Sequence, residues 1–291
     1  MKKQITIYEA VRLWMIDLDT RLAFFDLELY SFIEQLRETK FFNKQAVKGL
    51  RKNTNIKKKF IEVSDYLVDN KLVIKGYNNY FIIGKETPDE LEIVCSLYNI
   101  GYISYLSAMR FYKITSKVSK NIDYIAPNRL AWKKLQTTKR EGNKRLVSPY
   151  PSENVEINKK YMNVFSRSHL YYPVFSGSNI RVISIGDLFL EMIRYPKVCG
   201  GFLHVLEVYE QVARDFLDEI ISSTDSYGTD IDKCRVGFIL NSYLDITDSR
   251  VLEWKAQSIA RGGSRKMISD EPYSENYDAG WCISLNHNVF R

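Results

Sequence analysis

KFFNKQAVKGLRKNTNIKKKFIEVSDYLVDNKL, residues 40–72, is the stretch on which the fold prediction depends. Eight Lys or Arg residues and no Asp or Glu lie between Lys40 and Phe60. Residues 37–85 carry a net charge of +8, whereas the whole chain carries +7, so the remainder is close to neutral. The basic character is therefore local, and a local basic surface favours a polyanionic partner.

The residues around this stretch predict a helix-turn-helix followed by a hairpin. Asn43 is expected to cap a short helix over residues 44–50, and RKNTN (residues 51–55) has the composition of a turn. Thr54 or Asn55 then begins a second helix, whose apolar side chains recur with helical spacing. Two short β-branched and aromatic runs within residues 71–84 predict a hairpin. This order is typical of a winged helix.

Upstream, apolar periodicity predicts helices over residues 8–20 and 26–38, with Asp26 as a plausible N-cap of the second. The sequence thus indicates an N-terminal winged helix-turn-helix domain over residues 1–86, which includes an N-terminal helical extension. A larger mixed α/β domain is expected over residues 87–291. The predicted fold class is α+β.

In a winged helix, the helix that begins near Ile56 enters the major groove with its N-terminus first. We expect Lys57, Lys58 and Lys59 to contact bases, and Thr54 and Asn55 to cap the helix or contact phosphate. The side chains predicted to contact phosphate are Lys44, Lys48, Arg51, Lys52 and Lys75. Because lysine discriminates bases poorly, part of the base recognition is expected from Asn53, Asn55 and Asn78. The alternative is a solvated lysine surface with no specific partner.

The remaining two thirds of the chain predict alternating helices and strands. We expect helices over residues 89–97, 100–112, 187–194, 204–220, 234–241 and 251–260, and strands over residues 121–127, 155–167, 170–175, 180–185 and 281–285. Residues 128–152 are predicted to form a basic loop, which is either solvated or a second phosphate contact. Its basic residues are Arg129, Lys133, Lys134, Lys139, Arg140, Lys144 and Arg145.

Cysteine spacing and terminal composition limit the other classes of protein. The four cysteines are far apart and form no CxxC pair, which argues against a zinc ribbon and a disulfide scaffold. A reduced, cytoplasmic protein without metal or cofactor is expected. The N-terminus does not resemble a signal peptide, and no run of about 18 apolar residues predicts a membrane span.

The nearest enzymatic interpretation is a nucleotidyltransferase, which places Gly-Ser upstream of paired Mg²⁺-binding acids. Gly177-Ser178 precedes Asp187, but Leu188 and Phe189 stand where the second acid is needed. A helix-capping role for Asp187 is better supported. No P-loop, GxSxG or HExxH motif occurs, and we predict no enzyme activity. His204 is expected to be a core histidine, and Cys199 has no neighbouring His or Asn pattern to activate it.

Three segments resemble the AbiEi family, the antitoxins of AbiE-type (type IV) toxin–antitoxin systems. They are IGYISYLSAMRFYKIT (residues 100–115), RVISIGDLFLEMIRYPKVCGG (residues 181–201) and the tail around Trp281. The matching positions of the last two segments are Ser184, Asp187, Leu188, Glu191, Pro196, Gly200, Gly201, Tyr277, Trp281 and Asn286. Gly186-Asp187 departs from the family, which has an acidic residue followed by arginine. The resemblance extends from about residue 27 to residue 286.

The resemblance implies a repressor that binds repeats in the promoter of its own operon. It further implies that the C-terminal domain neutralises a nucleotidyltransferase-like toxin, and that the protein is a monomer in solution that binds DNA cooperatively. A second class of function is left open by the residues themselves. The basic surface could contact an acidic protein partner, or the toxin, without specific DNA binding.

Overall fold

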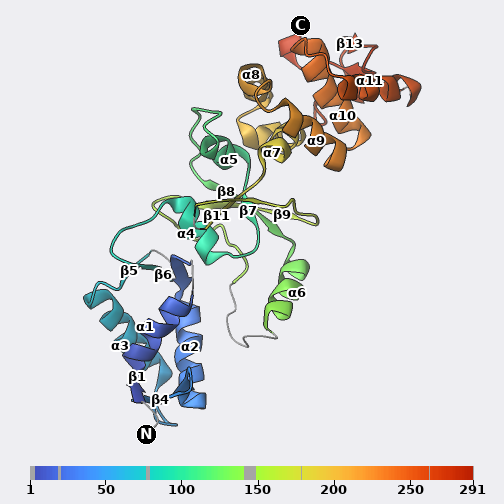
Figure 1. The fold of residues 1–291 in the computed structure, drawn as a ribbon. Coiled ribbons are helices and arrows are strands. Elements are labelled where there is room, and N and C mark those ends of the chain that lie inside the picture. Colours follow the sequence, from blue (N-terminus) through green and yellow to red (C-terminus); the bar gives the residue numbers. More distant parts are fainter. Residues whose placement is uncertain are drawn as a thin grey trace. The chain divides into compact units, whose positions relative to one another are not determined.

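The computed structural model describes residues 4–18, 21–76, 79–140, 149–177, 179–261 and 263–290. Helices and several small sheets make a mixed α+β architecture in this part of the chain (Figure 1). The chain divides into two compact units, Met1–Ile103 with Lys120–Val182, and Ser104–Ser119 with Ile183–Arg291. The domain boundary predicted between residues 86 and 87 falls inside the first unit, and it stays a prediction.

Three helices and their shared core begin the first unit. They are α1 (Ile7–Asp17), α2 (Asp26–Thr39) and α3 (Ile56–Asp69). Thr6 and Glu9 start α1 with a reciprocal capping box, in which the Glu9 amide donates to the Thr6 hydroxyl at 3.2 Å. The helices predicted over residues 8–20 and 26–38 are confirmed. The N-cap of α2 is Phe25, one residue earlier than predicted, because the Glu28 carboxylate accepts from the Phe25 amide at 2.8 Å.

A three-stranded antiparallel sheet closes one end of these helices, with its strands in the order β2-β6-β5. Its strands are β2 (Ala23–Phe25), β5 (Val73–Lys75) and β6 (Tyr80–Ile83). The hairpin predicted within residues 71–84 is therefore confirmed. Phe24 lies opposite Phe81 in the sheet, and both rings are buried with Trp14 in the helical core. Burial of these large rings fixes the helices on one face of the sheet.

The short helix predicted over residues 44–50 is wrong. This segment is a hairpin of β3 (Phe41–Phe42) and β4 (Gln45–Lys48), and β4 also pairs in parallel with β1 (Gln4–Thr6). Asn43 and Lys44 form its two-residue turn with φ values of 45° and 64°. Both central residues of a type I′ turn need positive φ, which an α-helix excludes, so Asn43 marks a turn and not a helix cap.

A five-stranded sheet fills the rest of the first unit, in the order β10-β11-β7-β8-β9. Its strands are β7 (Tyr102–Ile103), β8 (Ile122–Pro127), β9 (Met162–Arg167), β10 (Val174–Ser176) and β11 (Ile180–Val182). The strand expected over residues 121–127 is confirmed as β8, which is buried at every position. The strands expected over residues 155–167, 170–175 and 180–185 are confirmed in part, because each observed strand is shorter.

Two helices accompany this sheet. The helix expected from residue 89 is confirmed as α4 (Glu90–Leu97), whose N-cap Asp89 accepts from the Leu91 amide at 2.8 Å. The loop predicted over residues 128–152 is wrong in its first half, which forms α6 (Arg129–Arg140). Asn128 caps this helix by accepting from the Ala131 amide at 2.9 Å, and Trp132 in its first turn is buried. Lys144 and Arg145 lie outside the described residues.

The helix predicted over residues 100–112 is wrong in its first third. Gly101 has a φ of 112°, and a Cβ at this position would lie 2.3 Å from the Ile125 carbonyl oxygen. Glycine thus allows β7 to approach β8 closely, which a helix at residue 101 would prevent. Only α5 (Tyr105–Phe111) is helical, and it belongs to the second unit.

The second unit is built mainly from helices. Besides α5, these are α7 (Ile185–Arg194), α8 (Phe202–Val212), α9 (Leu217–Tyr227), α10 (Asp230–Gly237), α11 (Ser249–Arg261), the 3₁₀ turns η1 (Pro196–Cys199) and η3 (Asn288–Phe290), and the π-helical turn η2 (Phe238–Tyr243). The single helix predicted over residues 204–220 is wrong. The chain turns after Val212, which lets Phe216 pack against Phe189, and α9 then begins at Leu217.

The C-terminal tail forms a small sheet in the order β12-β14-β13. Its strands are β12 (Arg265–Lys266), β13 (Tyr277–Asp278) and β14 (Ile283–Ser284). Trp281 is fully buried beside α10, and a Cβ on Gly237 would lie 2.2 Å from its ring. The indole donates to the Ser242 hydroxyl at 3.1 Å. Of the tail residues with the family resemblance, Trp281 and Asn286 are therefore buried in the second unit, whereas Tyr277 is exposed.

All four cysteines are buried and free of disulfides. Within the described ranges, no helix has both the length and the apolar character that crossing a bilayer demands.

Candidate nucleic-acid interface

The start of α3 is held by two short-range hydrogen bonds. The Asn55 side-chain oxygen accepts from the Lys58 amide at 3.1 Å, so Asn55 is the N-cap. The Thr54 hydroxyl accepts from the Arg51 amide at 2.7 Å, and the Thr54 amide donates to the Arg51 carbonyl at 3.0 Å. The predicted capping role of Asn55 is confirmed. These bonds form a tight turn that holds Arg51 and Lys52 in solvent beside the helix start.

The three lysines in the first turn of α3 have different surroundings. Lys57 and Lys58 are exposed, and no described carboxylate forms an ion pair with either. Lys59 is only partly exposed and forms an ion pair with Glu62, and its hydrogen bond lowers the pKa of that carboxyl. Lys57 and Lys58 are therefore more available for a ligand than Lys59.

An open polar hollow of about 450 Å³ lies against the start of α3. It is lined by Gly49, Leu50, Arg51, Thr54, Asn55, Lys58, Lys59 and Glu62. Five of the sequence-predicted site residues thus meet at one place. Arg51 and Lys58 contribute cations, Lys59 is paired there with Glu62, and unbonded backbone N–H groups belong to any helix N-terminus. This combination suits an anionic group such as phosphate.

The other predicted phosphate contacts lie at different distances from this hollow. Lys48 is exposed and immediately precedes its lining residue Gly49, at the end of β4. Lys44 is exposed in the β3–β4 turn, four residues further away along the chain. The hairpin is attached to the end of α2, because the Lys40 ammonium group donates to the Leu50 carbonyl at 2.8 Å. Lys52 and Asn53 are exposed in the turn before α3.

Lys75 is separate from this group. It lies on β5, beyond the C-terminal end of α3 (Figure 1). Its charge acts on Asp26 at the start of α2. Burial raises the pKa of Asp26, and Lys75 partly opposes that effect. Asn78 lies outside the described residues.

The charges on α3 run against its own helix dipole. The first turn has no acid and three lysines, whereas the last turn has no base and Asp69 is its final residue. Each such charge costs about 0.3–1 kcal/mol relative to the favourable arrangement. Acids do occupy the first turn of other helices in the chain, including α1, α2, α4, α7, α9 and α10. The lysines in the first turn of α3 and the acid in its last turn therefore lower the stability of the helix.

Asp187, the acid considered for an enzymatic site, is fully engaged in the second unit. Its two carboxylate oxygens accept from the Ser223 hydroxyl at 2.5 Å and the Ser184 hydroxyl at 2.6 Å. Ser184 is the N-cap of α7, and Asp187 lies three residues later in the first turn, so the prediction that Asp187 is the cap is wrong. Ser178 lies outside the described residues. No group of three or more potential metal ligands occurs in the described part of the chain.

The two other residues considered as reactive groups, His204 and Cys199, are both buried. His204 is buried, and its ring nitrogens lie 2.8 Å from the Thr115 hydroxyl and 3.3 Å from the Glu207 carboxylate. The interpretation of His204 as a core histidine is confirmed. Cys199 is buried at the end of η1.

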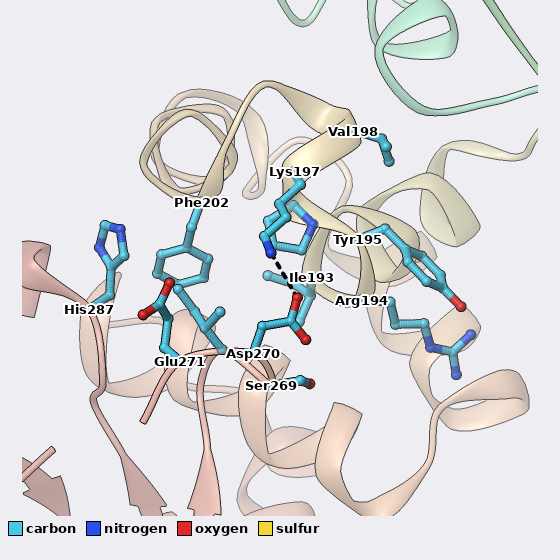
Figure 2. Close-up of a pocket in the computed structure, with 12 residues that line it drawn as sticks. Ile193, Arg194, Tyr195, Lys197, Val198, Phe202, Ser269, Asp270, Glu271 and His287 are labelled. Atoms are coloured by element: carbon cyan, nitrogen blue, oxygen red, sulfur yellow. Dashed lines mark hydrogen bonds and ion pairs between the residues drawn. The ribbon is translucent and has the colours of Figure 1, made fainter. Parts of the chain in front are cut away.

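A second hollow, of about 390 Å³, lies in the second unit and was not predicted (Figure 2). Apolar residues including Ile193 and Phe202 line it, and the Lys197–Asp270 ion pair lies at its edge with a separation of 2.9 Å. Half of its lining, residues 193–198, lies within the segment of residues 181–201 that resembles the AbiEi family. The other lining residues come from distant segments that only the fold brings together, so the sequence did not predict the hollow. Its size suits a small apolar group.

Comparisons with known proteins name no family for this chain. No family model and no curated protein matches it. Among solved structures, the crystal structure of the RV2827C protein from Mycobacterium tuberculosis is similar with a TM-score of 0.45 and 8% identity, over 88% of this chain and 90% of that chain. Similarity at this level does not indicate a function. The residues at the start of α3 are the better guide to what the chain binds.

Proposed function

We propose that the chain is a DNA-binding transcriptional repressor of its own toxin–antitoxin operon and the antitoxin to a nucleotidyltransferase-like toxin. One observation carries the DNA-binding part. Lys57 and Lys58 stand exposed at the positive end of α3, where they destabilise the isolated helix. A polyanion placed there reverses that cost, because phosphate accepts from the helix N-terminus and from the lysines together.

The order of the surrounding elements supports the same proposal. Helices α2 and α3 are followed by the β5–β6 hairpin, and β2 joins this hairpin as the third strand. We interpret this order as a winged helix in which a hairpin replaces the predicted short helix, and on this interpretation α3 enters the major groove. The β3–β4 hairpin takes the place of the predicted short helix, with Lys44 exposed in its turn and Lys48 immediately before Gly49, which lines the hollow at the start of α3. These two lysines are proposed to contact phosphate beside the groove.

The antitoxin part rests on the resemblance to the AbiEi family. Several residues of that resemblance have scaffold roles in the second unit: Ser184 caps α7, and Gly200 and Gly201 have φ values of 91° and 96°, which favour glycine. These roles fix the helices of the second unit, to which the proposal assigns toxin neutralisation without a cofactor or enzyme activity. In this proposal the protein is a cytoplasmic monomer that binds repeated DNA sites cooperatively.

DNA binding is tested by titrating the protein against a labelled duplex taken from upstream of its own gene, with a scrambled duplex as competitor. The proposal predicts a shifted complex that the scrambled duplex does not displace at a tenfold excess. Binding that both duplexes displace equally would leave only non-specific charge attraction. No binding to either duplex would favour the alternative, in which the basic surface contacts an acidic protein.

The antitoxin role has an independent test. The gene that lies next to this one in the operon is expressed alone and together with this chain, and growth is followed. The proposal predicts growth arrest by the neighbouring gene and recovery on co-expression. Recovery should persist with Lys57→Ala/Lys58→Ala when both genes are under foreign promoters, because neutralisation is assigned to the C-terminal domain. Arrest without recovery would contradict the antitoxin role and leave the DNA-binding role intact.

A further inference from the structure

Ile61 is a large apolar side chain on the exposed surface of α3. It is 50% exposed, although Ile56, Val63 and Leu67 of the same helix are buried in the core. Exposed single apolar residues are common on proteins, so exposure alone decides little. The position of Ile61 among the charged residues of α3 gives it a more specific meaning.

Helical geometry places Ile61 between the two exposed lysines. With a rotation of about 100° per residue, Ile61 lies about 40° from Lys57 and about 60° from Lys58 around the helix axis. Side chains on a helix tilt towards its N-terminus, so Ile61 leans towards the turn that carries both lysines. The three side chains therefore share one surface, with the apolar group between two cations.

The acids on the same surface limit how far a nucleic acid can extend along α3. Asp65 follows Ile61 by one turn, and Asp69 follows by two. Both are exposed, and carboxylates are repelled by DNA phosphates. A duplex that contacts the positive end of α3 thus meets Lys57, Lys58 and Ile61. The other apolar side chains of the first two turns are turned to the core, because Ile56 and Val63 are buried and Phe60 packs against the core residues.

Building on the DNA-binding function proposed above, we infer that Ile61 reads a thymine by contact with its 5-methyl group. That methyl group is the apolar feature of the major-groove edges of the four bases, and it distinguishes thymine from cytosine. Lysine is a flexible point charge and discriminates bases weakly. Ile61 therefore supplies discrimination that the lysines lack, while they supply affinity.

The test first selects duplexes that bind the wild-type protein from a random library. Each thymine in the selected site is then replaced singly by deoxyuridine, which removes only the 5-methyl group. At one or two positions the wild-type protein should bind about fourfold more weakly, which corresponds to the roughly 0.8 kcal/mol of one buried methyl group. The same duplexes are bound to Ile61→Ala and to Ile61→Val, which retains apolar contact.

Ile61→Ala should bind the thymine and uracil duplexes equally, and Ile61→Val should still prefer thymine. A preference that persists in Ile61→Ala would overturn the inference, because it would come from DNA shape or from another residue. A wild-type protein that binds selected DNA but is weakened less than twofold at every deoxyuridine would also overturn it. Failure to select any duplex would instead overturn the DNA-binding function and this inference with it. Unchanged circular dichroism shows that the variants fold.

Discussion

At the scale of single residues, the side chains at the start of α3 are of two kinds: some stabilise the helix N-terminus, and others are exposed to solvent. Asn55 and Thr54 use their side-chain oxygens to accept from backbone amides, and Lys59 is paired with Glu62. Lys57 and Lys58 have no such partner among the described carboxylates. The sequence predicted the capping of Asn55 correctly, because Asn before a helical apolar pattern has a local cause. It could not predict the Lys59–Glu62 pair, which depends on side-chain rotamers.

The observed cap role of Asn55 and its proposed role at the DNA interface can be separated by substitution. Asn55→Ala should lower the free energy of unfolding by about 1 kcal/mol, because the Lys58 amide loses its acceptor. Asn55→Asp should preserve stability, since aspartate caps equally well, but weaken DNA binding about tenfold through repulsion of phosphate. Urea denaturation and fluorescence anisotropy measure the two effects. Unchanged DNA affinity in Asn55→Asp together with reduced affinity in Asn55→Ala would show that Asn55 acts through the cap alone.

At the scale of elements, local patterns predicted the helices and the β5–β6 hairpin, and failed where tertiary pairing decides. Residues 45–48 are a strand because β1, far earlier in the chain, pairs with them. Tyr102–Ile103 is a strand because Gly101 permits close approach to β8. The partner strands, β1 and β8, lie too far away in the sequence for a local pattern to indicate them. Strand pairing therefore outweighed local helix propensity at both places. The start of α3 was predictable for the opposite reason, because its cap and charges are local.

The β3–β4 turn gives a test at this scale. Lys44 has a φ of 64°, a conformation that glycine adopts without a Cβ penalty. Lys44→Gly should therefore raise the free energy of unfolding by about 0.5–1 kcal/mol. If Lys44 also contacts phosphate, the same variant should bind DNA more weakly although it is more stable. Lower stability in thermal and urea unfolding would show that the turn is not type I′.

At the scale of the whole molecule, the two units differ in net charge. The first carries 28 Lys or Arg and 18 Asp or Glu, whereas the second carries 14 Lys or Arg and 17 Asp or Glu. Both contain buried, paired acids, such as Glu28 with Arg21 in the first unit and Asp232 with Arg194 in the second. Burial raises the pKa of Asp232, but hydrogen bonds from Arg194 at 2.8 Å and from Thr229 outweigh burial and hold its pKa below the usual value. The mixed α+β class was predictable from composition and spacing, but this ion pair, whose partners are 38 positions apart in the chain, was not.

The lowered pKa of Asp232 predicts how stability depends on pH. The charged form is stabilised in the folded state, so its contribution is present above the unfolded value near 3.8 and disappears as pH falls through the lower folded value. Asp232→Asn should cost about 2–3 kcal/mol at pH 7, and less below pH 4. Urea denaturation of both proteins from pH 7 to pH 3 measures this. A difference that stays constant over that range would contradict the assignment.

The most direct test of the central claim is the salt dependence of DNA binding. Affinity for the upstream duplex is measured from about 50 to 200 mM salt for the wild type, for Lys57→Ala/Lys58→Ala, and for Lys85→Ala, an exposed lysine outside the stretch of residues 40–60 as the matched control. We predict a steep linear fall of log affinity with log salt. Its slope should flatten by about one for each phosphate that the double variant no longer neutralises, and should not change in the control. Equal slopes and affinities for all three proteins would contradict a DNA-binding surface at the start of α3.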